Sequence, residues 1–284
     1  MKRVAISVIT VLLVTNVTSE QAYGADQTKI RAANIGIQAV TTLVSGAIQG
    51  KVRSGRDVVR CLLSGSASGY GFYEAKVLVA DRHVQTGWLV SNVAASMSEN
   101  AAAGRNPFAQ LGYSLGPFRI RISIPPLDRD ADAYAYVDVS EYETLSLIRA
   151  YRDNDKMRFR KGLIMFERHS VYPDNDDDGF EAIGRTYGMF PGLSPAADDT
   201  TWPHEVIHAI QALQGDAVEP ALSFLSYKPT KQSNQPRRII RFEHLKVGMI
   251  NIVSDQIVGR QPYHERWYEI EAFRLTEDIA PPKF

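Results

Sequence analysis

The sequence has one cysteine, Cys61, among its 284 residues, so no disulfide can form within the chain. Cys61 lies in an apolar stretch without a histidine or acidic pattern around it, and we expect a buried small side chain rather than a nucleophile. The sequence also lacks an excess of charge of either sign, because Lys+Arg and Asp+Glu both number 32. Nucleic-acid-binding domains usually have a clear basic excess, so we expect no nucleic-acid partner.

Long apolar runs are absent as well. No segment reaches the ~18 consecutive apolar residues expected of a membrane-spanning helix. The stretch Val4–Val17 follows two basic residues and precedes Ala22-Tyr23-Gly24, which has the small residues of a cleavage site. We therefore expect residues 1–24 to be a signal peptide, with an uncleaved N-terminal anchor as the alternative. The mature protein is then expected to be periplasmic or secreted.

Composition divides the rest of the chain near Gly116. Residues 25–116 are rich in Ala, Gly, Ser and Val, and their periodicity predicts helices. The apolar positions of the first helix fall on one face, at Ile30, Ile37, Val40, Val44 and Ile48. A second helix is expected to begin near Val58, and residues 98–106, which are polar and rich in Ala and Gly, are expected to form a loop.

Glycines four positions apart occur twice in this region, as Gly46-x-x-x-Gly50 and Gly65-x-x-x-Gly69. This spacing allows two helices to approach closely, and between membrane-spanning helices it favours dimerisation. Because charged residues interrupt every apolar run here, we expect tightly packed soluble helices. Peripheral contact of these helices with a membrane is the alternative.

Residues 117–284 alternate strand and helix patterns, which predicts an α+β fold with a mixed sheet. Strands are expected at 118–124, 134–139, 162–166 and 239–252, and helices at 140–151 and 269–276. Apolar and polar residues alternate in the first of these strands, as is typical of a half-buried strand. The segment 162–166 is either a core strand or an edge strand that pairs with a peptide substrate. A loop of about thirty residues is expected to follow it.

The segment His204-Glu205-Val206-Ile207-His208 has the clearest chemistry in the chain. Pro203 suits the first turn of a helix and Gly215 suits its end, so a helix is expected between them. Side chains four positions apart share one face of a helix, and both histidines can therefore reach one zinc ion. Glu205 neighbours His204 and can act as the general base on a zinc-activated water molecule.

A catalytic zinc site needs a third protein ligand. The chain resembles the gluzincin-type zinc metallopeptidases, in which this ligand is a glutamate of a later helix, often within Glu-x-x-Ala. Glu269-x-x-Ala272 matches that pattern, and Glu271 is the competing glutamate. The chain is also similar to small uncharacterised bacterial proteins with His-Glu-x-x-His-x-x-Gln and a later Tyr-Glu-x-Glu-Ala. Gln211 stands at the position of their glutamine.

The resemblance implies a small zincin-like domain over residues 117–284, with zinc as its cofactor and a peptide or protein as its substrate. The chain departs from the gluzincin pattern at Phe273, where an aspartate often supports a zinc-binding histidine. Asp198, Asp199 or Glu271 is expected to supply this support.

Peptide hydrolysis also needs a hydrogen-bond donor near the developing oxyanion. Four candidates precede Glu269, namely Tyr263, His264, Arg266 and Tyr268. We select His264 as the second catalytic residue, with an ordinary loop histidine as the alternative.

The acidic segment Asp174–Asp178 has the carboxylate spacing of a calcium loop, and Gly179 follows it. Position 12 of such a loop is normally a glutamate, whereas this chain has Arg185 there. We expect a solvated acidic loop first and a weak Ca²⁺ site second.

Together these patterns predict an exported zinc metallopeptidase with the ligands His204, His208 and Glu269 and the general base Glu205. The alternative is a non-catalytic, zinc-stabilised envelope or interaction module, against which the intact Glu205 argues. A third hypothesis is a secreted effector whose N-terminal helices deliver or inhibit the catalytic part.

Overall fold

The computed structural model describes residues 27–124, 127, 135–152, 156–167, 172–173, 181–182, 184–187, 190–193, 201–215, 240–241 and 267–276. These residues form a mixed α+β fold, which confirms the predicted fold class at this level. The helices are α2 (Gln27–Ile48), α3 (Gly55–Ala80), α4 (Val84–Ala102), α5 (Glu141–Arg152), α6 (Thr201–Gln214) and α9 (Trp267–Thr276). The predicted signal peptide lies outside the described residues.

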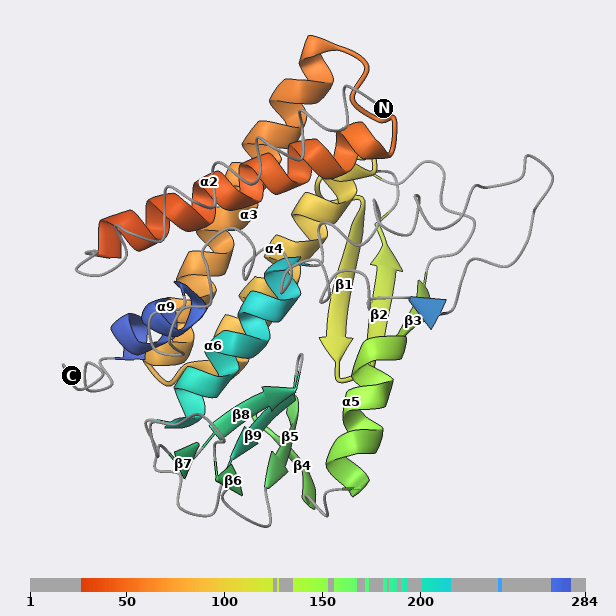
Figure 1. Ribbon diagram of the computed structural model, residues 1–284. Helices are drawn as coiled ribbons and strands as arrows, with labels where there is room; N and C mark the ends of the chain where they lie inside the picture. Colours follow the sequence, from red (N-terminus) through yellow and green to blue (C-terminus); the bar gives the residue numbers. More distant parts are fainter. Residues whose placement is uncertain are drawn as a thin grey trace.

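Helix α6 lies at the centre of the molecule (Figure 1). It packs against α3, α4 and α9, and strands β8 (Gly184–Tyr187) and β9 (Phe190–Leu193) lie against it as well. None of the helices in the described part of the chain has the length and hydropathy needed to cross a bilayer. The predicted peripheral membrane contact stays a prediction.

Helices α2 and α3 cross at two glycines of α3. A Cβ atom on Gly65 would lie 2.7 Å from Ala39 Cα, and one on Gly69 would lie 2.4 Å from the carbonyl oxygen of Asn34. Ordinary side chains cannot be placed so close to a neighbouring backbone. The close helix contact predicted at Gly65-x-x-x-Gly69 is therefore confirmed.

This crossing predicts that Gly69→Ala destabilises the protein. The added methyl group must push the α2 backbone away, and we expect the free energy of unfolding to fall by about 1–3 kcal/mol. Gly36→Ala is the matched control in α2, because a Cβ atom there meets nothing within 4 Å. That control should be neutral or stabilising by up to about 1 kcal/mol. Denaturant titration measures both changes, and equal effects of the two substitutions would contradict the close crossing.

The buried face of α2 differs from the apolar face predicted for this helix. Its buried residues are mainly small or polar: Ile30, Asn34, Gln38, Ala39, Thr42, Ser45 and Gly46. Val40, Val44 and Ile48 are only half-buried. The close approach of α3 leaves little room for branched side chains, and local hydrogen bonds such as Thr42 Oγ1 to Gln38 O (2.7 Å) satisfy the buried polar groups.

The loop predicted at 98–106 is wrong in its first half, because α4 continues to Ala102. Its polar residues are buried against strands instead of facing solvent. Ser98 donates a hydrogen bond to Ala95 O (3.0 Å), and Asn100 donates to the carbonyl oxygen of Gln110 (2.7 Å). Polar composition indicates a loop only when the residues are exposed, and these residues serve as hydrogen-bond partners within the fold.

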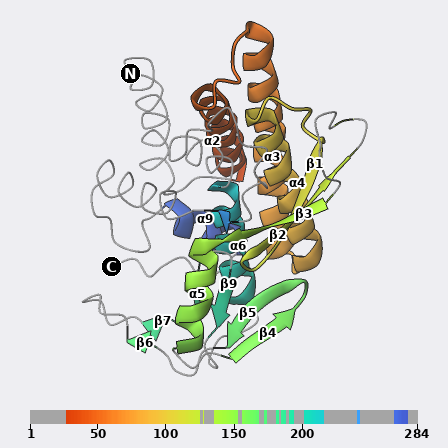
Figure 2. The ribbon, with the colours of Figure 1, turned by 90° about the vertical axis from the view of Figure 1, so that its right-hand side faces the viewer.

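The first sheet has the order β1-β2-β3-β10 and lies against α4 (Figure 2). Its strands are β1 (Gln110–Leu115), β2 (Phe118–Ser123), β3 (Ala135–Ser140) and β10 (Ile240–Arg241). Strands β1, β2 and β3 form an antiparallel meander, and β10 pairs parallel to β3. The strands predicted at 118–124 and 134–139 are confirmed, and the remainder of 239–252 lies outside the described residues.

Strand β2 is half-buried, and its buried side is the arginine side. Arg119 is 2% exposed and bonds Glu99 of α4 (2.9 Å), whereas Ile120 and Ile122 are 39% and 53% exposed. Arg121 bonds both Glu99 and Asp138 of β3. The alternating pattern therefore predicts the strand correctly. The ion pairs with Glu99 explain why the arginine side, and not the isoleucine side, faces inward.

Side chains of α4 bond backbone groups along the outer edge of β1. These groups include the N–H groups of Gly112 and Ser114 and the carbonyl groups of Gln110 and Ser114. Four α4 side chains bond these groups: Trp88 (3.1 Å), Asn92 (2.7 Å), Ser96 (2.8 Å) and Asn100 (2.7 Å). The helix therefore takes the place of a further strand at this edge.

The second sheet has the order β4-β5-β9-β8, and a separate pair joins β6 to β7. Its remaining strands are β4 (Lys156–Arg160) and β5 (Leu163–Glu167), and the pair is β6 (Tyr172–Pro173) and β7 (Glu181–Ala182). The long loop predicted after β5 is wrong, because strands β6 to β9 lie within it. Strand β5 pairs with β4 along its whole length and with β9 at Phe166 and Glu167, which favours the core-strand alternative for the segment 162–166.

One hydrophobic core joins the helices before Gly116 to those after it. Phe72 and Trp88 of the N-terminal helices share this core with Ile207 and Leu213 of α6 and with Ala272 of α9. All five side chains are at most 1% exposed. The domain boundary near Gly116 stays a prediction, and the described residues on both sides of it pack together.

Candidate metal centre

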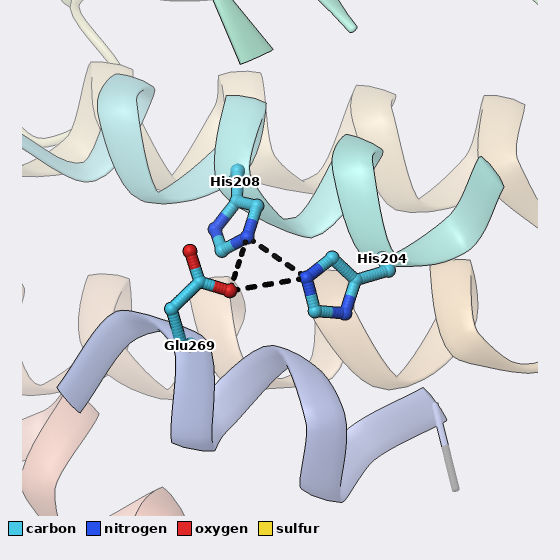
Figure 3. Close-up of side chains that lie close together, drawn as sticks. All are labelled: His204, His208 and Glu269. Atoms are coloured by element: carbon cyan, nitrogen blue, oxygen red, sulfur yellow. Dashed lines mark hydrogen bonds and ion pairs between the residues drawn. The ribbon is translucent and has the colours of Figure 1, made fainter. Parts of the chain in front are cut away.

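Helix α6 directs two imidazoles at helix α9 (Figure 3). His204 and His208 are four positions apart, which places them on the same face of the helix. The other faces of α6 carry Val206, Ile207 and Ile210, which are fully buried. Burial of these apolar side chains fixes the rotation of α6, so the histidines face α9.

Helix α9 brings Glu269 to both histidines. Glu269 Oε2 lies 3.2 Å from His204 Nε2 and 3.2 Å from His208 Nε2, and the two Nε2 atoms lie 3.0 Å apart. The Glu269 side chain is almost fully buried. The structure therefore assembles the three residues that the sequence suggested as metal ligands, although Glu269 follows the histidines by more than sixty positions in the chain.

The triangle fits a zinc ion. Ligand atoms at about 2.05 Å from a tetrahedral zinc are separated from one another by about 3.3 Å, close to the separations of 3.0–3.2 Å between these three atoms. Two imidazole nitrogens and one carboxylate oxygen are also the donor set of many catalytic zinc sites. Within the described residues, His204, His208 and Glu269 are the cluster of this kind that can hold a metal ion.

Glu271 does not share this position. Its Oε2 atom lies 2.8 Å from Lys76 Nζ, and both side chains are 1% exposed. Its Oε1 atom accepts a hydrogen bond from Asn34 Nδ2 (2.6 Å). Of the two glutamates that the sequence left in competition, Glu269 points to the histidines and Glu271 forms a buried ion pair with α3.

Every hydrogen of the Lys76 ammonium group has an acceptor. Asn34 Oδ1 and Gln214 Oε1 lie 2.9 Å from Nζ, in addition to Glu271. Burial lowers the pKa of Lys76, and the Glu271 charge opposes this shift. The complete set of acceptors favours a charged lysine, because an ammonium group can donate three hydrogen bonds.

Gln211 connects this ion pair to the metal site. Its Oε1 atom lies 2.7 Å from His208 Nδ1, and its Nε2 atom donates to Tyr268 O (2.9 Å) and to Glu271 Oε2 (2.8 Å). Of the three residues from which we expected support for a zinc-binding histidine, Glu271 contacts Gln211, and Gln211 in turn contacts His208. Asp198 and Asp199 lie outside the described residues.

Aromatic rings enclose the two histidines. The Phe273 ring lies 4.6 Å from the His204 ring, and the Tyr268 ring lies 5.9 Å from the His208 ring. Phe273 stands at the position where gluzincins often have an aspartate, and in this chain its ring contacts the His204 ring. The sequence showed this departure from the pattern but not what replaces the aspartate.

The electrostatics of the site favour a cation among these residues. Burial lowers the pKa of His208, but the Glu269 carboxylate, with help from Glu205 and Gln211, outweighs this effect and raises it to about 9. Two buried carboxylates thus stabilise positive charge at His208. A zinc ion that displaces the proton of His208 would satisfy the same carboxylates.

The remaining site predictions fall outside the described residues. These are His264, the other oxyanion candidates Tyr263 and Arg266, and the Asp174–Asp178 loop. They stay predictions. Lys76 and Asn34, which the sequence patterns did not reveal, have no local signal that marks them, because their partners lie in distant segments.

No protein-family model, curated protein or solved structure matches this chain. The functional argument accordingly starts from the geometry of the three ligand residues and the groups that surround them.

Proposed function

We propose that this protein is an exported zinc-dependent peptidase. The observation that carries the proposal is the triangle formed by His204 Nε2, His208 Nε2 and Glu269 Oε2, with sides of 3.0–3.2 Å. Two of its corners lie on the helix that also contains Glu205, a residue with the chemistry of a general base. The resemblance of this helix and of Glu269-x-x-Ala272 to gluzincins supports a peptide or protein as substrate.

Zinc, when bound, acts as a Lewis acid and lowers the pKa of a water molecule. Glu205 takes the proton of the attacking water and passes it to the nitrogen of the leaving amine. Its carboxylate is 4% exposed, and its charge contributes to the raised pKa of His208. Glu205 is therefore close to the ligand residues and is screened from bulk water, which strengthens its electrostatic influence.

The proposal includes export, on the basis of the signal-peptide pattern in residues 1–24. It also includes His264 as the donor to the developing oxyanion. Both rest on the sequence. Tyr268, the described oxyanion candidate, packs its ring against His208.

A non-catalytic, zinc-stabilised module is the second candidate function. The observation that favours it is the burial of the ligand residues, together with the polar contacts that join α6 and α9 to α2 and α3. A zinc ion in such a position would hold helices together whether or not hydrolysis takes place. The intact Glu205 favours the peptidase.

Metal analysis of the purified mature chain tests the proposal. We expect about one zinc ion per chain and loss of most of it in Glu269→Ala, because two histidines alone bind zinc weakly. Glu167→Ala is the control, since this glutamate lies on an exposed strand position. A wild-type chain without zinc, or a Glu269→Ala variant with full zinc content, would refute the proposed ligand set.

A further inference from the structure

We infer that Gln211 is a positioning residue of the metal centre and that the buried Lys76–Glu271 ion pair sets its orientation. The inference rests on the proposed zinc site and adds to it a support that comes from the N-terminal helices. A chain of contacts runs from His208 through Gln211 and Glu271 to Lys76 of α3 and Asn34 of α2.

The contacts of Gln211 determine which way its amide faces. Tyr268 O and Glu271 Oε2 can only accept hydrogen bonds, so the atom of Gln211 that contacts both must be the NH₂ group. The amide oxygen therefore faces His208 Nδ1, at 2.7 Å. An amide oxygen can only accept, and so Nδ1 carries a hydrogen.

This hydrogen decides the tautomer of His208. With Nδ1 protonated, a neutral imidazole has its lone pair on Nε2, the atom that faces His204 and Glu269. The contact with Gln211 thus leaves the Nε2 lone pair of His208 available to a metal ion and restrains the plane of the ring. Outer contacts of this type strengthen metal binding through orientation and ligand basicity.

Glu271 is held firmly enough to orient Gln211. Its two oxygens receive hydrogen bonds from Asn34, Lys76 and Gln211, and Lys76 has acceptors for all three of its hydrogens. Glu271 follows Glu269 by two positions in α9, so contacts that fix Glu271 also fix the turn that carries Glu269. Helices α2 and α3 thereby influence the positions of two ligand residues, His208 through Gln211 and Glu269 through the shared turn of α9.

Zinc affinity of the full mature chain, measured by chelator competition, tests this role. Gln211→Leu keeps the side-chain bulk but removes the contacts to His208 and Glu271, and we expect the zinc dissociation constant to rise about 10–100-fold. Gln85→Leu is the control, at an exposed glutamine of α4. It makes the same change of side chain away from the contacts of His208, Glu271 and Lys76, so zinc affinity should stay near the wild-type value.

A destabilised variant outside the site separates positioning from general loosening of the fold. Ser140→Ala removes the acceptor for Glu143 N at the start of α5 (3.1 Å) and should lower the thermal midpoint through loss of a helix cap, with zinc affinity near the wild-type value. Gln211→Glu keeps an acceptor for His208 but places a carboxylate against Glu271 and Tyr268 O, and it should weaken zinc binding.

The outcomes separate this inference from the proposed function. A wild type that binds zinc, together with unchanged affinity in Gln211→Leu, overturns the positioning role and leaves the ligand set intact. Losses of affinity in Gln85→Leu or Ser140→Ala that equal the loss in Gln211→Leu overturn it as well. A wild type that binds no zinc overturns the proposed function and this inference together.

Discussion

Glu205→Gln should abolish most peptide hydrolysis and leave zinc in place. Glutamine has the shape of glutamate but cannot accept the proton of the attacking water, and loss of a general base typically lowers the rate about 10²–10⁴-fold. Glu205 is not one of the three converging ligand residues, so zinc content should match that of wild type. Cleavage of a peptide mixture, followed by mass spectrometry, measures the loss.

The controls for this experiment are a chelator and an exposed glutamate. A chelator should stop cleavage by the wild type, and Glu167→Gln, at a half-exposed side chain of β5, should leave the rate unchanged. Undiminished cleavage by Glu205→Gln would refute its role as the base. A zinc-loaded wild type that cleaves no peptide would favour the non-catalytic module.

Lys76→Met should destabilise the protein strongly, and more than Gly69→Ala. It leaves the Glu271 carboxylate buried without a cation, and removal of one partner of a buried ion pair typically costs about 3–5 kcal/mol. Lys51→Met, at an exposed lysine, should cost little. Denaturant titration of the metal-free proteins measures the difference.

A second variant keeps this prediction testable if Lys76→Met does not fold. Lys76→Met/Glu271→Gln removes both charges and retains a side chain that can bond Asn34 and Gln211. Because no unpaired charge remains buried, this double variant should recover a large part of the lost stability. Equal stability of the single and double variants would show that the buried charge of Glu271 is not the cause.

Local patterns in the sequence predict much of this structure. The helix predicted at 140–151 is present as α5, which ends at Arg152, and Glu143 N donates to Ser140 Oγ (3.1 Å) at its start. The spacing of His204 and His208 predicts that they converge. Features of this kind depend on residues a few positions apart, and the backbone geometry of a helix or strand determines them.

Contacts between distant segments cannot be predicted from local sequence patterns. Nothing near Lys76 in the sequence distinguishes it from an ordinary helix residue, because its partner Glu271 lies 195 positions away. The alternating pattern of β2 suggests that its arginines face solvent. In the structure, Arg119 and Arg121 instead form ion pairs with Glu99 of α4. In both cases a buried charge determines the packing, and hydrophobic periodicity contains no information about charge pairing.

The two sheets differ in how their outer strands are protected from other chains. At β1, four backbone groups that could pair with another strand already bond side chains of α4, which opposes extension of the sheet there. Strand β4 has no such cover among the described residues, but Lys156 and Arg160 place positive charge at its two ends, and Arg158 pairs with Glu167 of β5. Two copies of β4 that met edge to edge would repel each other, which limits aggregation of the folded protein through this strand.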